Sequence, residues 1–149
     1  MKTVVAAALG ECVHVAGVMR FLRLAESAGW KTVFLGPAVP VEQVLESARK
    51  EKADLVAVSY RLTPETGERL LGEFAEAADD LYRAGVRFAF GGTPPVAEKA
   101  RAIGFFERTF DGSEAVEAVL AYVKGQSHAE PLPGDFPQTA VERIAWKAP

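Results

Sequence analysis

Short apolar segments alternate with amphipathic segments along most of the chain. The apolar segments are continuous or nearly so, which is typical of strands covered by helices on both faces. They predict strands at residues 3–9, 32–35, 54–59, 86–90 and 105–110. Between them, apolar residues recur at helical spacing and predict helices at 14–28, 41–52, 65–84, 96–103 and 114–124. Because this alternation favours right-handed crossovers, we predict an α/β fold: a three-layer sandwich around a five-stranded parallel sheet.

Residues that begin and end helices stand between these segments. Thr63 and Thr93 each precede a proline, which predicts an N-cap followed by proline at the first helical position. Ser113 followed by Glu114 predicts another cap with an acidic first turn. Glycines that can end the helices follow at Gly29, Gly85, Gly104 and Gly125.

The character of the sequence changes near Gly125. Residues 126–149 contain four prolines and show no helical repeat before 139–146; the prolines are Pro131, Pro133, Pro137 and Pro149. We therefore predict one domain over residues 1–125 and a C-terminal arm or linker over 126–149. The arm either packs on the domain surface, or docks on another subunit or leads into a further domain.

The composition is that of one globular domain. The chain has 149 residues, 49% of them hydrophobic, and a net charge of −3. A domain of this size buries about 70% of the surface of its unfolded chain. Basic residues do not cluster beyond Arg49–Lys50, and no apolar run approaches the roughly 18 to 20 residues that span a bilayer. We expect neither nucleic acid nor a membrane as a partner.

The only cysteine, Cys12, excludes an intramolecular disulfide and predicts a cytoplasmic location. Residues 1–10 superficially resemble a short secretion signal, but Glu11 and an amphipathic segment follow directly. We therefore interpret them as a buried strand.

Parallel sheets bind ligands at the carboxyl ends of their strands, so the informative loops are residues 10–14, 59–63 and 91–93. These loops lack the motifs of several common α/β functions. Gly10 and Gly17 are too far apart for a dinucleotide-binding glycine motif. Val18 stands where a small cysteine phosphatase needs its arginine, and the lysine of a P-loop is absent.

The residues of these three loops resemble the three signatures of the cobalamin-binding domain family. Residues 10–17 read G-E-C-V-H-V-A-G and resemble G-x-D-x-H-x-x-G, with Cys12 in place of the aspartate. Ser59 begins the second signature, S-x-L, in which Arg61 replaces the leucine and Leu62 follows one residue later. A glycine pair, Gly91–Gly92, matches the third. The signatures occur in the expected order, each after the expected strand.

This resemblance implies a flavodoxin-like fold and a cobalamin cofactor, either adenosylcobalamin or methylcobalamin. The imidazole of His14 would be the lower axial ligand of cobalt in place of the cofactor's own base. The displaced nucleotide tail would then occupy a slot beside Ser59 and Gly91–Gly92. The cofactor contacts implied by the resemblance are Gly10, Glu11, Cys12, Val13, His14, Gly17, Ser59, Tyr60, Leu62, Gly91, Gly92 and Thr93.

The resemblance further implies a carrier that is not an enzyme on its own. Cobalt supplies the chemistry, and the loops hold no carboxylate pair, so we expect a larger catalytic or methyltransferase subunit as partner. The reaction would be a radical mutase-type rearrangement or a methyl transfer. Size and layout resemble the small cobalamin-carrying subunits of glutamate mutases, which favours the mutase. A homo-oligomer, a degenerate interaction or regulatory domain without cofactor, and a binder of another nucleotide-like ligand remain open.

Cys12 also leaves several outcomes open at His14. In the family that the chain resembles, the aspartate accepts the second ring N–H of the histidine, and a neutral thiol is a poor acceptor. Glu11 could replace the aspartate, the bond from His14 to cobalt could be weaker, or the cofactor could be held mainly by its tail. Cys12 could also be reactive or contact cobalt itself.

Overall fold

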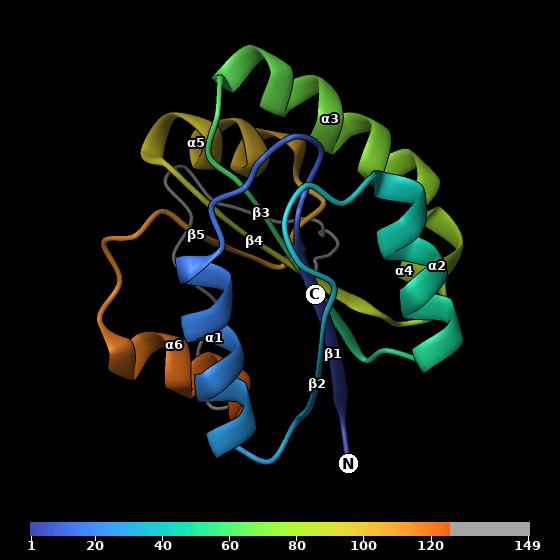
Figure 1. The fold of residues 1–149 in the computed structure, drawn as a ribbon, viewed down its shortest axis with the longest axis vertical. Helices are drawn as coiled ribbons and strands as arrows, with labels where there is room; N and C mark the ends of the chain where they lie inside the picture. Colours follow the sequence, from blue (N-terminus) through green and yellow to red (C-terminus); the bar gives the residue numbers. More distant parts are fainter. Residues whose placement is uncertain (126–149) are drawn as a thin grey trace.

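A five-stranded parallel sheet forms the centre of the structure, a computed structural model that describes residues 1–125 (Figure 1). The strands are β1 (Thr3–Ala8), β2 (Lys31–Phe34), β3 (Leu55–Tyr60), β4 (Arg87–Gly92) and β5 (Arg108–Phe110). They pair in the order β2-β1-β3-β4-β5, and every pairing is parallel. The predicted flavodoxin-like α/β fold is confirmed. In this strand order the chain reverses its direction of winding between β1 and β3, and such sheets bind ligands at that point.

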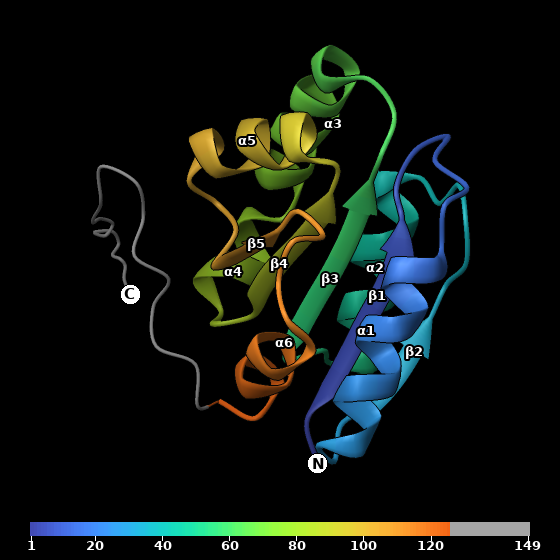
Figure 2. The same cartoon turned by 90° about the vertical axis from the view of Figure 1, so that its left-hand side faces the viewer.

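Helices cover both faces of the sheet (Figure 2). They are α1 (Ala16–Ser27), α2 (Val41–Glu51), α3 (Pro64–Ala77), α4 (Asp79–Arg83), α5 (Pro94–Ile103) and α6 (Val116–Val123). Alternate residues of a strand point to opposite faces, and β1 illustrates this. Val4 and Ala6 belong to the core beneath α1 and α6, whereas Val5 and Ala7 belong to the core beneath the other helices.

The predicted helix starts at Thr63 and Thr93 are confirmed. Both residues are N-caps with proline in the first turn, although neither side chain bonds to the helix backbone. The predicted cap at Ser113 is wrong, because α6 begins only after Ala115. Local contacts explain the difference: the Glu114 carboxylate accepts bonds from the backbone N–H groups of Asp111 and Gly112 at 2.9 and 3.1 Å.

The helix predicted at 65–84 is interrupted. Ala78 has φ −94° and ψ 7°, and the chain forms α3 before it and the short helix α4 after it. Both pieces still bury their apolar residues, Leu71 and Phe74 in α3 and Leu81 in α4. The interruption therefore does not change which face of the segment is buried.

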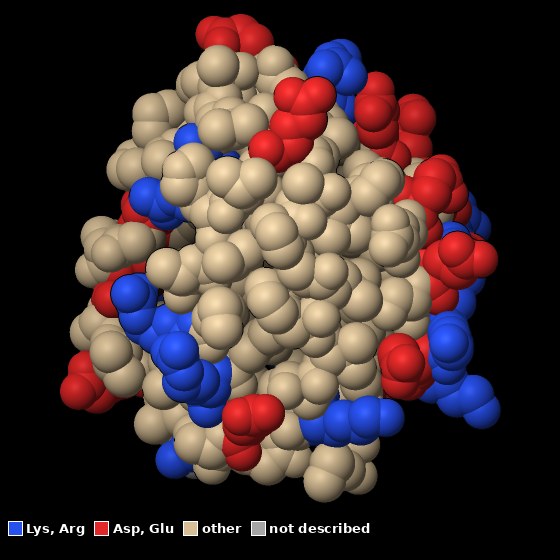
Figure 3. Space-filling view, viewed as in Figure 1, with Lys and Arg blue, Asp and Glu red and all other residues tan. Residues whose placement is uncertain are grey.

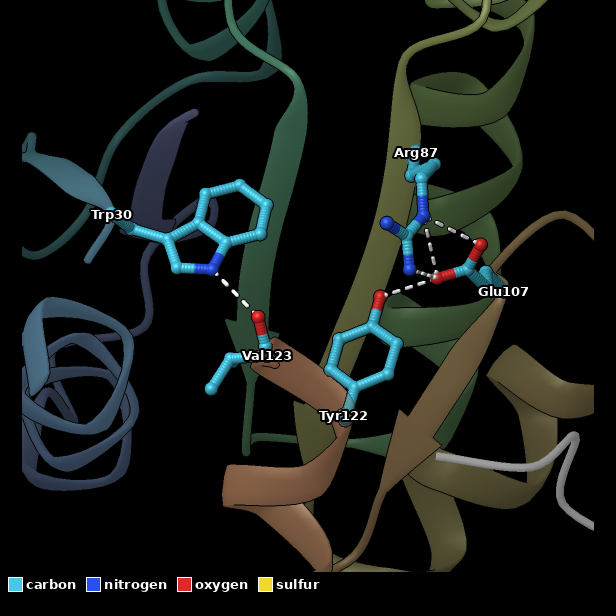
Figure 4. A network of polar contacts seen from close by, with 5 residues as sticks. All are labelled: Trp30, Arg87, Glu107, Tyr122 and Val123. Atoms are coloured by element: carbon cyan, nitrogen blue, oxygen red, sulfur yellow. Dashed lines mark hydrogen bonds and ion pairs between the residues drawn. The ribbon is translucent and has the colours of Figure 1, made fainter. Parts of the chain in front are cut away.

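Polar contacts hold the end of α6 against the sheet (Figure 4). Trp30 donates its Nε1–H to the carbonyl of Val123 at 2.7 Å, and the Tyr122 hydroxyl lies 2.7 Å from Glu107 Oε2. Glu107 also pairs with Arg87 at 2.6 Å. Burial raises the pKa of the Tyr122 hydroxyl well above its usual value, so the hydroxyl stays protonated and donates to the carboxylate.

The predicted arm at residues 126–149 lies outside the described residues. Within residues 1–125, no helix is both long enough and apolar enough to cross a bilayer.

Candidate functional site

A cavity of about 330 Å³ lies between α1, α6 and the carboxyl ends of β3 and β4. It adjoins the place where the sheet reverses its winding, which is where the sequence predicts a ligand. The residues around it are His14, Gly17, Val18, Arg20, Phe21, Leu24, Ala57, Val58, Ser59, Arg61, Ala89, Phe90, Gly91, Gly92, Phe110, Gly112, Glu114, Val116 and Val119. Most of these side chains are apolar, so the cavity suits an apolar group with a few polar contacts.

Ser59 places an unpartnered hydroxyl on the cavity wall. The residue is 8% exposed, and its Oγ is buried without a hydrogen-bond partner. Ser59 lies in the interior of the sheet, opposite Ala8 on one side and Gly91 on the other. A buried hydroxyl without a partner destabilises a fold by about 1–3 kcal/mol. A ligand atom that bonds this hydroxyl would remove that cost.

The two glycines after β4's apolar run differ in what surrounds them. A Cβ on Gly92 would lie 2.5 Å from the carbonyl oxygen of Tyr60 and 2.9 Å from the ring of Phe90. A Cβ on Gly91 would meet only the carbonyl oxygen of Phe110, at 4.0 Å. The fold itself therefore requires glycine at 92. At 91 the missing side chain leaves space in the cavity instead.

His14 lies in the loop between β1 and α1, exposed, at the edge of the cavity. Its Nδ1 is 3.6 Å from the sulfur of Cys12, whereas no described residue bonds to its Nε2. The backbone of Cys12 fixes the loop, because its N–H donates to Leu9 and its carbonyl accepts from Ala38 at 3.0 and 2.8 Å. Nε2 is thus the nitrogen that His14 can offer to a ligand.

The structure shows which neighbouring group lies beside the imidazole of His14. The thiol of Cys12, rather than the carboxylate of Glu11, is next to the imidazole, and Glu11 is exposed without a bond to His14. Cys12 is completely buried. Its burial separates the thiol from solvent, so the arrangement favours His14 over Cys12 as the donor to an external ligand.

Of the remaining predicted cofactor contacts, some line the cavity and others lie beside it. Gly17 lines the cavity, and a Cβ built on it would meet nothing within 4 Å. Gly10 forms the turn after β1 with φ +65°. Val13 and Leu62 are exposed at this edge of the sheet, at 62% and 39%. Thr93 is the N-cap of α5 and does not line the cavity.

Tyr60 was expected to line the slot and does not. Neighbouring strand residues face opposite sides, and Ser59 occupies the side of the cavity. The ring of Tyr60 lies on the other side, in the core beneath the helices that include α3, where it contacts the position of Gly67. Tyr60 therefore supports the sheet rather than a ligand.

The walls formed by α1 and α6 were not predicted. Phe21 and Leu24 follow Gly17 on one face of α1, and Val116 and Val119 face them from α6. The helical spacing of these apolar residues was visible in the sequence, but it is the same for a helix packed on a sheet.

Metal binding by the protein alone has no support in the described residues. Within residues 1–125, no three His, Cys, Asp or Glu side chains come together as a metal site. A metal at His14 would need other ligands from outside these residues, for example from a macrocycle that surrounds the ion.

Comparison with protein families matches residues 2–120 to the B12 binding domain. Similar solved structures include a cobalamin-binding protein from Desulfitobacterium hafniense DCB-2, which is 22% identical with a TM-score of 0.66 and matches 83% of this chain and 56% of its own. The methanol:cobalamin methyltransferase complex MtaBC from Methanosarcina barkeri is 25% identical with a TM-score of 0.63, over 85% of this chain and 48% of that one.

The monomethylamine corrinoid protein from Methanosarcina barkeri is 21% identical with a TM-score of 0.60, over 83% of this chain and 55% of its own. The chain thus spans about half the length of the solved chains that it matches.

Proposed function

Since this chain belongs to the B12-binding domain family, we propose that it is a corrinoid carrier in which His14 is the lower axial ligand of cobalt. The cofactor's nucleotide tail would enter the cavity between α1 and α6. The bound corrinoid supplies the cobalt chemistry, and the chain's own residues bind the tail, orient the ring and keep water from the slot.

The observation that carries this proposal is the unpartnered hydroxyl of Ser59. Once the tail's benzimidazole no longer binds cobalt, one of its ring nitrogens is free to accept a hydrogen bond. The hydroxyl of Ser59 is the buried donor in this cavity, and the space left by Gly91 admits a planar base beside it. The apolar walls suit the rest of the base.

His14 fits the role of axial ligand through its Nε2. Its other nitrogen lies beside the Cys12 thiol, a weaker hydrogen-bond partner than a carboxylate. Partners of this kind orient a metal-bound histidine and tune its basicity. We therefore expect His14 to bind cobalt more weakly than a histidine paired with aspartate.

A larger catalytic subunit completes the proposed function. Residues around the cavity include only one carboxylate, that of Glu114, so they offer no acid–base pair for a substrate. One of the structures similar to this chain is a methanol:cobalamin methyltransferase complex, which favours methyl transfer over the mutase-type reaction. A cytoplasmic location remains a prediction from the single cysteine.

Mixing the purified protein with hydroxocobalamin, followed by gel filtration and a visible spectrum, tests the proposal. We expect one corrinoid per chain and a spectrum of an imidazole-ligated cobalt. His14→Ala should retain the corrinoid through its tail but lose the imidazole spectrum. His128→Ala, which alters the only other histidine, is the control and should match the wild type. Colourless wild-type protein would favour the degenerate interaction domain, and identical spectra for wild type and His14→Ala would exclude His14 as ligand.

Ser59→Ala should affect the free and loaded protein in opposite directions. Without ligand, removing a buried hydroxyl that has no partner should leave the free energy of unfolding unchanged or raise it by about 1 kcal/mol. With ligand, the lost hydrogen bond should weaken cobalamin binding about fivefold. Urea denaturation and a spectral titration measure the two effects. Unchanged affinity would contradict the assignment of Ser59 to the tail.

A further inference from the structure

Two arginines at the cavity have no partner among the residues that the structure describes. Among residues 1–125, Arg20, Arg23 and Arg61 are the arginines without a hydrogen bond, ion pair or ring contact. Arg20 and Arg61 line the cavity, and Arg23 does not. They approach it from different elements, Arg20 from α1 and Arg61 from the loop after β3.

The charge around the cavity is positive, although the whole chain has a net charge of −3. Glu114 is the one carboxylate in the cavity lining, and its two oxygens accept bonds from the backbone N–H groups of Asp111 and Gly112. Among the described residues, no ion pair joins it to either arginine. Figure 3 shows Lys and Arg side chains gathered over α1, beside a hollow in this face of the molecule.

The arginines lie nearer to solvent than the apolar residues contributed by β4. Phe90 and Ala89 are almost completely buried, whereas Arg20 and Arg61 are exposed. Along a corrinoid tail, the base lies farthest from the ring, and a phosphodiester lies between the two. A base inserted among the buried apolar residues would leave this anion near the exposed arginines.

We propose that Arg20 and Arg61 bind the phosphodiester of the nucleotide tail and make this chain selective for complete corrinoids. The inference rests on the proposed function, because it assumes that the tail enters this cavity. Guanidinium groups form paired, charge-assisted hydrogen bonds to phosphate oxygens, a geometry that lysine lacks. At position 61, where the family signature has leucine, this chain gains a recognition group for a part of the cofactor outside the corrin ring.

Binding of hydroxocobalamin and of cobinamide, which lacks the phosphate-linked nucleotide, tests the proposal by spectral titration. We expect Arg61→Gln and Arg20→Gln each to weaken cobalamin binding about fivefold to tenfold and to leave cobinamide binding unchanged. Arg61→Lys should retain part of the affinity. The matched control is Arg23→Gln, which alters an arginine of α1 that does not line the cavity and has no partner within residues 1–125; it should bind like the wild type. Thermal unfolding confirms that each variant is folded.

Competition by the tail alone isolates the phosphate. In the wild type, α-ribazole phosphate should displace cobalamin at lower concentration than α-ribazole, and this difference should disappear in the Arg20→Gln/Arg61→Gln variant. Equal losses of affinity for cobalamin and for cobinamide in the Arg20 and Arg61 variants would overturn the inference. An equal loss of cobalamin affinity in Arg23→Gln would also overturn it. Neither result would contradict cobalamin binding itself. A wild type that binds neither corrinoid would overturn the proposed function together with it.

Discussion

Gly92→Ala is expected to lower the free energy of unfolding by about 3 kcal/mol. This is the largest loss of stability that we expect from adding one methyl group to a glycine of the cavity. The new Cβ would lie 2.5 Å from the carbonyl oxygen of Tyr60. Tyr60 and Gly92 are paired residues of β3 and β4, so neither backbone can move without disturbing the sheet. Urea denaturation, monitored by circular dichroism, measures the loss.

Gly91→Ala is the matched control for this prediction. The same methyl group one residue earlier has no heavy atom closer than 4.0 Å, and neither glycine has a positive φ. We expect a change in unfolding free energy within about 0.5 kcal/mol, because the reduced freedom of the unfolded chain offsets small losses. Equal destabilisation by the two substitutions would contradict the distinction between a glycine required by the fold and one that leaves space for a ligand.

Gly91→Leu is expected to weaken cobalamin binding about 70-fold while the protein remains folded. The leucine side chain would fill the space beside Ser59 that we assign to the base of the tail. A base that buries about 100 Å² of apolar surface gains about 2.5 kcal/mol, and exclusion of the base forfeits this gain. Spectral titration measures the affinity, and cobinamide serves as a ligand without the base.

Cobinamide should bind Gly91→Leu and the wild type equally well. Gly91→Ala, with its shorter side chain, should show an intermediate loss of cobalamin affinity. Retention of tight cobalamin binding by Gly91→Leu would show that the tail does not occupy this cavity, even if the corrin ring still binds at His14.

The sheet and the helices were largely predictable because their signals are local. Continuous apolar runs marked the strands, and Thr63 and Thr93 before proline marked two helix starts. The break at Ala78 was not predictable, since the apolar spacing continues through it and residues 73–84 contain no glycine or proline. The start of α6 was misplaced because Glu114, next to the predicted cap at Ser113, bonds to the preceding loop.

The loops of the candidate site were predictable because parallel strands end at one edge of a sheet. The cavity walls were not, because an apolar stripe on α1 or α6 looks the same whether it packs on the sheet or faces open space. Neighbouring residues of a strand face opposite sides of the sheet. Assigning Ser59 to the slot would therefore have excluded the side chain of Tyr60 from it. The proximity of Cys12 to His14 depends on the loop conformation, so the sequence left several partners open and the structure placed the thiol there.

The polar contacts of α6 lie at one end of the helix. Their position determines which part of this cavity wall can move. Trp30 and Glu107 hold Val123 and Tyr122, at the last turn of the helix, whereas the bonds of Glu114 near its start remain within the preceding loop. The helix is therefore held more firmly at its last turn than at its first. If the base of the tail occupies this cavity as proposed, we expect a bulkier base to displace the first turn of α6, around Val116, more readily than the last turn.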